Sequence, residues 1–241
     1  MTDRICGVHA VFEALSSGRQ PIERVHISRD SHSGKIRQIA EIARQRNIPL
    51  RHEDRAVIER LGQGTVHQGV IAILGETKYG SFEDLFRSDK PLVVVLDGVE
   101  DPHNLGAVIR TAEACGASGI VVPDRHSAPL SATVAKASAG ASAYIPVVRV
   151  VNLVNAIDEM KERGLWIVGI DTAGNLSWTA YDYRTPVALV LGGEHRGLRR
   201  LVREHCDALV RLPMLGKVES LNISVAAAVA LYEVVRQRGM Q

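Results

Sequence analysis

The chain has 241 residues, of which 46% are hydrophobic and 23% charged. This ordinary globular composition excludes a disordered chain and, at roughly 150 residues per domain, predicts one to two domains. The longest unbroken apolar run, Val225 to Tyr232, is too short for a transmembrane helix, and the N-terminal residues lack the long apolar segment of a secretory signal. We therefore expect no membrane as a partner.

The three cysteines are far apart in the sequence, and none belongs to a CxxC pair or to a Cys/His spacing typical of zinc. This usage predicts a reducing, cytoplasmic environment and no metal site. Aromatic residues make up only 4% of the chain. A surface that binds RNA by stacking bases on rows of aromatic rings is therefore not expected.

The net charge of +2 is unevenly distributed, because residues 1–80 carry a balance of +3 and residues 81–241 a balance of −1. Two interpretations remain open at this point. The excess cations are either ordinary solvated helix faces or the sign of a first domain that faces a polyanion.

Residues 1–75 read as a small α/β unit, and the more polar segment 76–90 reads as a linker with one helical turn at 83–86. The helix over 34–47 is amphipathic, with four cations outside its apolar stripe. They are candidates for phosphate contacts or a solvated face: Lys35, Arg37, Arg44 and Arg46. The predicted elements are helices at 7–15, 34–47 and 56–61 and strands at 22–28, 48–51 and 70–75.

Residues 91–241 alternate apolar runs with helical stretches, which predicts an open α/β sheet. The runs are continuous rather than alternating, as in parallel strands that are covered on both faces. The last helix, from about Ser220 to Arg236, is apolar almost all round and is expected in the core or in a subunit interface. The predicted strands cover 91–99, 119–124, 165–171, 186–194 and 208–214.

Ligands of such sheets bind beyond the carboxyl ends of the strands, so candidate functional residues are expected in the loops that follow the strands. The first such loop that is rich in polar residues lies in the segment 96–117. Asn104 is expected to cap a helix that begins at Leu105. Arg110 lies off the centre of the apolar stripe of this helix, with Glu113 three residues further on. The two are either functional or a plain surface ion pair.

Two further loops follow later strands. In 189–198, Gly192 and Gly193 allow another group to approach the backbone closely, and Glu194 would stand at the mouth of the site. The pattern GGxxxG differs from the GxGxxG fingerprint of dinucleotide binding. A tight turn without a ligand is the alternative interpretation. In 211–233, Ser220 is a candidate N-cap, but three small polar residues at alternate positions from Ser220 exceed the need of one helix start.

Taken together and in this order, the segments HNLGAVIRTAEACGA, LVLGGEHRGL and LPMLGKVESLNISVAAAVALYE resemble the SpoU family of RNA ribose 2′-O-methyltransferases, within the SPOUT class. The resemblance covers the whole second part. The stretches CGVHAVFEAL and VHQGVIA are similar to the family's N-terminal substrate-binding domain. The two-part arrangement is most similar to the enzymes that modify a guanosine of 23S rRNA.

The resemblance implies a domain division of 1–75 for RNA binding, 76–90 for the linker and 91–241 for a knotted methyltransferase domain. It implies a deep trefoil knot, which sequence alone would not favour because knots are rare. It also implies that S-adenosylmethionine binds in the knot loops. The residues that the match assigns to this cofactor are Thr172, Gly192, Gly193, Leu212, Met214 and Leu221.

The resemblance further implies that Arg110 activates the ribose hydroxyl, either as proton acceptor or as electrostatic stabiliser of the developing alkoxide. Asn104 would position the ribose, and Glu194 would orient Arg110 or the ribose. Ser220 and Asn222 would tie the knot loop to this cluster.

The family is dimeric, which matches the apolar last helix and implies a homodimer through the knotted domain. The alternative functions are the same reaction on tRNA, a non-catalytic RNA-binding or ribosome-assembly factor, and an oxidoreductase. The missing GxGxxG pattern and the missing acidic ribose reader argue against the oxidoreductase.

Overall fold

The computed structural model describes residues 4–17, 21–75, 79–193 and 197–239, and the chain divides into two compact units, 1–78 and 79–241. Residues 79–90, which the sequence places in a linker, pack on the second unit, where Leu85 is fully buried and Gly80 pairs with Val148. The predicted helical turn in this segment is the 3₁₀ helix η1, Phe82–Phe86.

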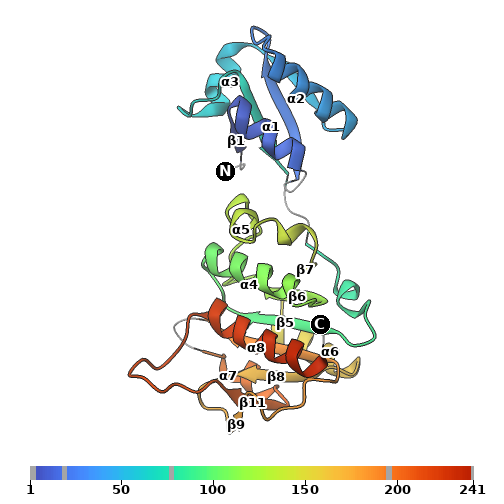
Figure 1. The fold of residues 1–241 in the computed structure, drawn as a ribbon, viewed down its shortest axis with the longest axis vertical. Coiled ribbons are helices and arrows are strands. Elements are labelled where there is room, and N and C mark those ends of the chain that lie inside the picture. Colours follow the sequence, from blue (N-terminus) through green and yellow to red (C-terminus); the bar gives the residue numbers. More distant parts are fainter. Residues whose placement is uncertain (1–3, 18–20, 76–78, 194–196, 240–241) are drawn as a thin grey trace. The chain divides into compact units, whose positions relative to one another are not determined.

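The first unit is a four-stranded sheet with helices on both faces (Figure 1). The strand order is β1-β4-β2-β3, with β2 and β3 parallel and the other pairs antiparallel. The first strand was not predicted, and the third begins two residues later than predicted. The elements are β1 (Arg4–Cys6), α1 (Val8–Ser17), β2 (Ile22–Ser28), α2 (Gly34–Gln45), β3 (Leu50–Glu53), α3 (Arg55–Gly62) and β4 (Val70–Leu74).

Alternation along β4 assigns the helices of this unit to the two faces of its sheet. Val70 and Ala72 pack against α1 and α2, whereas Ile71 and Ile73 pack against Ile58 of α3. Successive strand residues point to opposite faces, so the two helix groups lie on opposite sides.

The second unit is a seven-stranded parallel sheet, in the order β7-β6-β5-β10-β8-β11-β9. The strand at 147–150 and the two-residue strand near 176 were not predicted. The strands are β5 (Leu92–Asp97), β6 (Gly119–Pro123), β7 (Val147–Val150), β8 (Trp166–Ile170), β9 (Leu176–Ser177), β10 (Val187–Gly192) and β11 (Ala208–Arg211). The remaining helical elements are α4 (Pro102–Ala114), α5 (Ala132–Ala137), η2 (Ala141–Ala143), α6 (Leu153–Glu162), α7 (Arg200–Glu204) and α8 (Ile223–Arg238).

Both faces of this sheet are covered, as its continuous apolar strands predict (Figure 1). Leu92, Val94 and Leu96 of β5 belong to the core under α4 and α8. Val93 and Val95 belong to the core under α6 and α7. The carboxyl ends of all strands therefore open at one edge, between two helical layers.

Two predicted helix caps are wrong. Helix α4 begins at Pro102, and its N-cap is Asp101, whose carboxylate accepts from the backbone N–H of His103 at 2.6 Å. Proline is favoured at the first helical position, so the helix starts one turn earlier than the apolar stripe suggests. Helix α8 is capped by Asn222, which accepts from the N–H of Ser224 at 2.9 Å, and not by Ser220.

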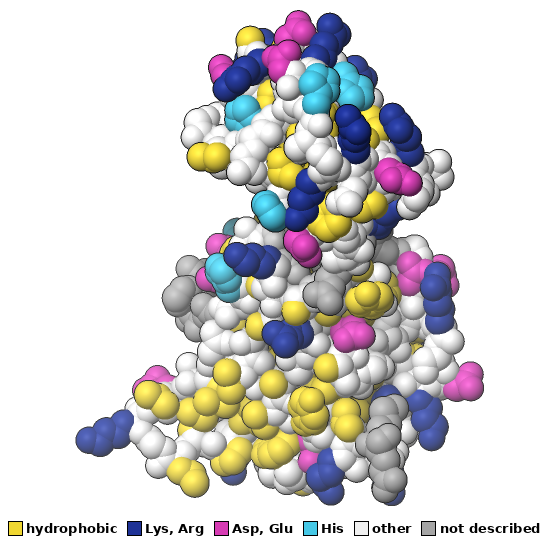
Figure 2. Space-filling model, turned by 45° about the horizontal axis from the view of Figure 1, so that its top comes forward, with side chains coloured by type: hydrophobic (Ala, Val, Ile, Leu, Met, Phe, Trp, Pro, Cys, Tyr) yellow, Lys and Arg dark blue, Asp and Glu magenta, His cyan; other side chains and the backbone are white. Residues whose placement is uncertain are grey.

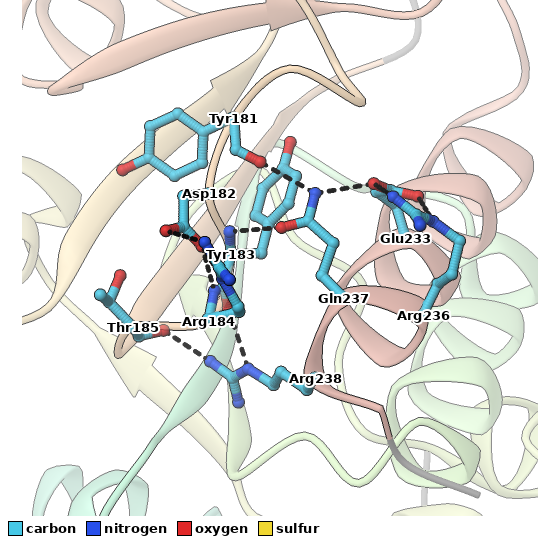
Figure 3. A network of polar contacts seen from close by, with 9 residues as sticks. All are labelled: Tyr181, Asp182, Tyr183, Arg184, Thr185, Glu233, Arg236, Gln237 and Arg238. Atoms are coloured by element: carbon cyan, nitrogen blue, oxygen red, sulfur yellow. Dashed lines mark hydrogen bonds and ion pairs between the residues drawn. The ribbon is translucent and has the colours of Figure 1, made fainter.

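The C-terminal end of α8 is fixed to the segment before β10 by a network of polar contacts (Figure 3). Gln237 Nε2 donates to the carbonyl of Tyr181 at 2.9 Å, and its Oε1 accepts from the N–H of Tyr183 at 2.9 Å. Arg238 donates to the carbonyls of Tyr183 and Thr185. The helix that carries Asn222 at its start is thus held at its far end.

A buried carboxylate completes this network. Glu233 is almost fully buried, and Arg236 donates two hydrogen bonds to it at 2.7 and 2.8 Å. These hydrogen bonds hold the pKa of Glu233 below its ordinary value despite burial. Among the described residues, no helix is both long and apolar enough to cross a membrane.

Candidate functional site

A cavity of about 310 Å³ lies beyond the carboxyl ends of β8, β10 and β11. Its lining contains all six residues that the resemblance assigns to the cofactor, together with Ser220: Thr172, Gly192, Gly193, Leu212, Met214 and Leu221. They come from three loops that are up to about fifty residues apart in the chain, and the parallel sheet brings them together.

The two glycines after β10 are required by backbone crossings. A Cβ at Gly192 would collide with the backbone of Gly197, and a Cβ at Gly193 would lie 2.6 Å from the carbonyl oxygen of Gly98. Gly193 also donates to the carbonyl of Asp97 at 3.0 Å. The sequence predicts a close approach of a ligand here; the structure shows, in addition, a close approach of the chain to itself.

Two of the predicted catalytic residues are in direct contact. Asn222 Nδ2 donates to Asn104 Oδ1 at 3.0 Å, across 118 residues of sequence. Asn222 meanwhile uses its Oδ1 to cap α8. One amide therefore joins the starts of α4 and α8 beside the cavity.

Arg110 lies on α4 and is exposed to solvent, as is Glu113. No ion pair joins these two described residues, so the interpretation as a surface ion pair finds no support. Arg110 is not part of the cavity lining. Glu194, the remaining predicted catalytic residue, lies outside the described residues.

Sequence reasoning missed two ion pairs at this edge of the sheet. Asp97 ends β5 with its side chain fully buried, and it accepts from Arg199 Nε at 2.5 Å and from the Arg199 backbone N–H at 2.8 Å. Asp171 follows β8, and its Oδ2 lies 2.8 Å from Arg203 Nη2. Each carboxylate directly follows or ends an apolar strand, which was the available signal.

The four cations predicted on the helix of residues 34–47 separate into two pairs. Lys35 Nζ lies 3.0 Å from His9 Nδ1 and 5.0 Å from the centre of the Phe12 ring, so it packs against α1. Arg46 donates to the carbonyl of Leu15 at 2.5 Å. Arg37 and Arg44 are exposed to solvent, as Arg46 is, but no hydrogen bond of their side chains to another described residue is present.

The cysteines do not form a reactive site. All three are free thiols. Burial raises the pKa of Cys206 to about 12, and it also raises the pKa values of Cys6 and Cys115. A thiol that stays protonated is a poor nucleophile, so no covalent cysteine chemistry is expected.

Apolar side chains gather over α8 and the loop that precedes it (Figure 2). Leu215 is 97% exposed and Val218 67%, and on α8 itself Val225 and Tyr232 are about half exposed. Val225 and Tyr232 are seven residues apart and therefore share a helix face. Large exposed apolar patches on a protein surface commonly mark sites of interaction with another molecule.

Family models match both units. A model of the SpoU rRNA methylase family matches residues 91–232. A model of the RNA 2′-O ribose methyltransferase substrate-binding domain matches residues 4–80.

Named relatives align with almost the whole chain. The putative TrmH family tRNA/rRNA methyltransferase YacO of Bacillus subtilis is 43% identical over 98% of this chain and 96% of its own. The 23S rRNA (guanosine-2′-O-)-methyltransferase RlmB of Pseudomonas aeruginosa is 42% identical over 98% of this chain and 97% of its own.

Solved structures show the same fold. The SpoU methyltransferase AviRb of Streptomyces viridochromogenes in complex with AdoMet has a TM-score of 0.75 at 27% identity, over 99% of this chain and 91% of that one. The AdoMet-bound rRNA methyltransferase of Sinorhizobium meliloti has the same TM-score at 29% identity, over 97% and 86%.

Proposed function

Because the chain belongs to the SpoU rRNA methylase family, we propose that it transfers a methyl group from S-adenosylmethionine to the ribose 2′-hydroxyl of a guanosine in 23S rRNA. The single observation that carries the proposal is that one cavity collects Ser220 and the six residues that the resemblance assigns to the cofactor, beside the Asn104–Asn222 hydrogen bond.

The cavity is suited to an adenosyl group. Its volume is at the lower end of the range for small-molecule sites, and its wall combines apolar side chains with polar groups in equal measure. Leu212, Met214 and Leu221 supply apolar surface for a flat base, and backbone groups in the same loops can read its edge. Thr172 and Ser220 supply hydroxyls.

S-Adenosylmethionine supplies a methyl group on a sulfonium, whose departing thioether is a good leaving group. The protein must hold the attacking hydroxyl in line with that methyl group, and such positioning removes a large part of the barrier. Asn104 is the residue that we assign to the ribose, because Asn222 fixes the orientation of its amide.

Arg110 faces solvent on α4, where an RNA can reach it. Arginine keeps its proton in proteins. We therefore assign it to the electrostatic stabilisation of the developing alkoxide, while the hydroxyl proton leaves to water or to an RNA phosphate. Glu194 keeps its family role of orienting Arg110 or the ribose, and Ser220 that of tying the loop to this cluster.

The knot belongs to the same proposal. Support comes from the sheet order, in which β11 lies between β8 and β9 although it follows β10 in the chain. Further support comes from Gly174, where a Cβ would lie 2.7 Å from the carbonyl carbon of Val210. A deep trefoil knot requires close backbone passages of this kind.

A homodimer through the second unit also belongs to the proposal. Its support is the exposed apolar surface of α8 and of the loop before it, which includes Leu215, Val218 and Tyr232. Sedimentation at micromolar concentration is expected to give twice the chain mass. A monomer under these conditions would contradict the dimer but not the reaction.

Residues 1–75 are proposed to bind the RNA and residues 91–241 to form the methyltransferase domain, to which residues 79–90 of the predicted linker are added because they pack on the second unit. Arg37 and Arg44 are the proposed phosphate contacts, because Lys35 and Arg46 already hold α1. A cytoplasmic location also belongs to the proposal, and its support is a reaction on rRNA together with three free thiols.

The test is methyl transfer to defined RNAs. The purified protein is incubated with tritiated S-adenosylmethionine and either 23S rRNA transcribed in vitro or total tRNA, and 2′-O-methylation is then mapped. We expect label on one guanosine of the rRNA. Label only on tRNA would show that tRNA is the substrate instead of rRNA; the name of the Bacillus relative includes both RNAs. Binding of RNA without transfer of label would indicate an assembly factor.

A further inference from the structure

The wall of the cavity contains a buried ion pair that the proposed reaction has not used. Asp171 is 5% exposed in its side chain and follows β8 directly. Arg203 reaches it from α7, and Nη2 of Arg203 lies 2.8 Å from Oδ2 of Asp171. Both residues line the cavity.

Asp171 is anchored on its other side. Its Oδ1 accepts from the N–H of Ala173 at 2.9 Å, and its backbone N–H donates to the carbonyl of Val210 at 3.0 Å. The carboxylate is therefore fixed by the turn after β8 and by β11. It orients Arg203 instead of adjusting to it.

The pair is not saturated. Oδ2 of Asp171 and Nε of Arg203 are both buried, and neither makes a hydrogen bond within the described part of the chain. A guanidinium has five N–H donors, and the ion pair occupies one nitrogen. The side chain of Arg203 is 40% exposed, so further donors are available on the cavity side. Buried polar groups in proteins normally have a hydrogen-bond partner, so an unsatisfied pair in a cavity wall is a candidate for binding a ligand hydroxyl, which both donates and accepts.

The sheet order indicates which part of the donor lies nearby. Methyl transfer is assigned to the loop after β5, whereas Asp171 follows β8, and β10 lies between these strands. Two strand spacings separate them by roughly 10 Å. Leu212, on the adenine side of the cavity, follows β11, which is the other neighbour of β8. The ion pair therefore lies between the sulfonium end and the base, where the donor carries its ribose.

We propose that Arg203 hydrogen-bonds the ribose hydroxyls of the methyl donor and that Asp171 is the positioning residue that holds its guanidinium. This inference rests on the proposed function, because it places the donor in this cavity.

The first experiment needs no variant. Binding of S-adenosylhomocysteine, the demethylated product, is measured by calorimetry beside its 2′-deoxy and 3′-deoxy analogues. We expect at least one analogue to bind about tenfold more weakly, the usual effect of losing a hydrogen bond to a charged group. Equal binding of all three would overturn the inference. Failure of S-adenosylhomocysteine itself to bind would overturn the proposed function first.

The second experiment separates recognition from architecture. R203M is expected to bind S-adenosylhomocysteine about tenfold more weakly and to lose the preference over the deoxy analogue; R203K should recover part of both. D171N should reduce the same preference. R200M is the matched control, since Arg200 lies on the same helix, pairs with Glu204 at the surface and does not line the cavity. If R203M weakens all three ligands equally, its role is structural and the inference fails.

Discussion

The two units use their cations differently. In the first unit, Lys35 lies on the amphipathic helix α2 and Arg46 caps its C-terminal end, and both contact the neighbouring helix α1. In the second unit, Arg199 and Arg203 pair with carboxylates that are buried at the ends of parallel strands. The carboxyl ends of parallel strands lie at the same edge of the sheet, so a carboxylate that ends a strand is held in place there. A cation at this edge forms an ion pair with a partner of fixed position. Substitutions in each unit are therefore expected to differ in what they impair: catalysis and stability in the second unit, RNA affinity in the first.

Arg110→Ala is expected to reduce methyl transfer at least ~10²-fold, the usual scale for a positioned group that assists proton transfer. Binding of S-adenosylhomocysteine should stay unchanged, because Arg110 does not line the cavity. Initial rates and calorimetry measure the two effects. Glu113→Ala, on the same helix, is the control and should retain its activity. Wild-type turnover in Arg110→Ala would remove this residue from the mechanism.

Gly192→Ala is expected to lower the free energy of unfolding by about 2 kcal/mol, because the new Cβ collides with the backbone of Gly197. Urea unfolding measures this change, and calorimetry should show weaker binding of S-adenosylhomocysteine. Gly216→Ala is the matched control, since a Cβ there meets nothing within 4 Å. Equal stability of the two variants would show that the turn after β10 yields easily.

Asn222→Ala is expected to lower the free energy of unfolding by about 1 kcal/mol through loss of the α8 cap. Asn222→Asp keeps an acceptor for the cap but loses the N–H donor to Asn104. Thermal unfolding should therefore show recovery of stability in Asn222→Asp, while methyl-transfer rates stay low. Full activity of Asn222→Asp would mean that the bond between the two asparagines has no part in catalysis.

Arg37→Ala and Arg44→Ala are each expected to reduce the slope of log affinity against log salt by about 1, without altering stability. RNA binding measured at several salt concentrations gives the slope. Arg46→Ala is a useful comparison, because it should destabilise the first unit by removing the bond to Leu15. If neither substitution alters the slope of log affinity against log salt, the RNA does not bind at α2.

Comparison with known proteins confirms the family, the methyltransferase activity and the dependence on S-adenosylmethionine that the sequence segments predict. The parallel sheet is also confirmed, because its strands form continuous apolar runs that both helical layers cover. The roles of single residues, the knot and the dimer stay predictions. The two helix caps were wrong because Asp101 and Asn222 compete with nearby polar residues, and local sequence does not rank such competitors.

The sequence by itself determined the modest length, the slight basic excess, the two-part organisation and the three segments that carry the family pattern. Only the tertiary structure decided that Asn104 and Asn222 touch, that the two glycines serve backbone crossings, and that Asp171 and Arg203 share the cavity wall. The physical reason is that these contacts join residues far apart in the chain. Periodicity and turn chemistry report on near neighbours, whereas strand order decides which loops meet at the edge of the sheet.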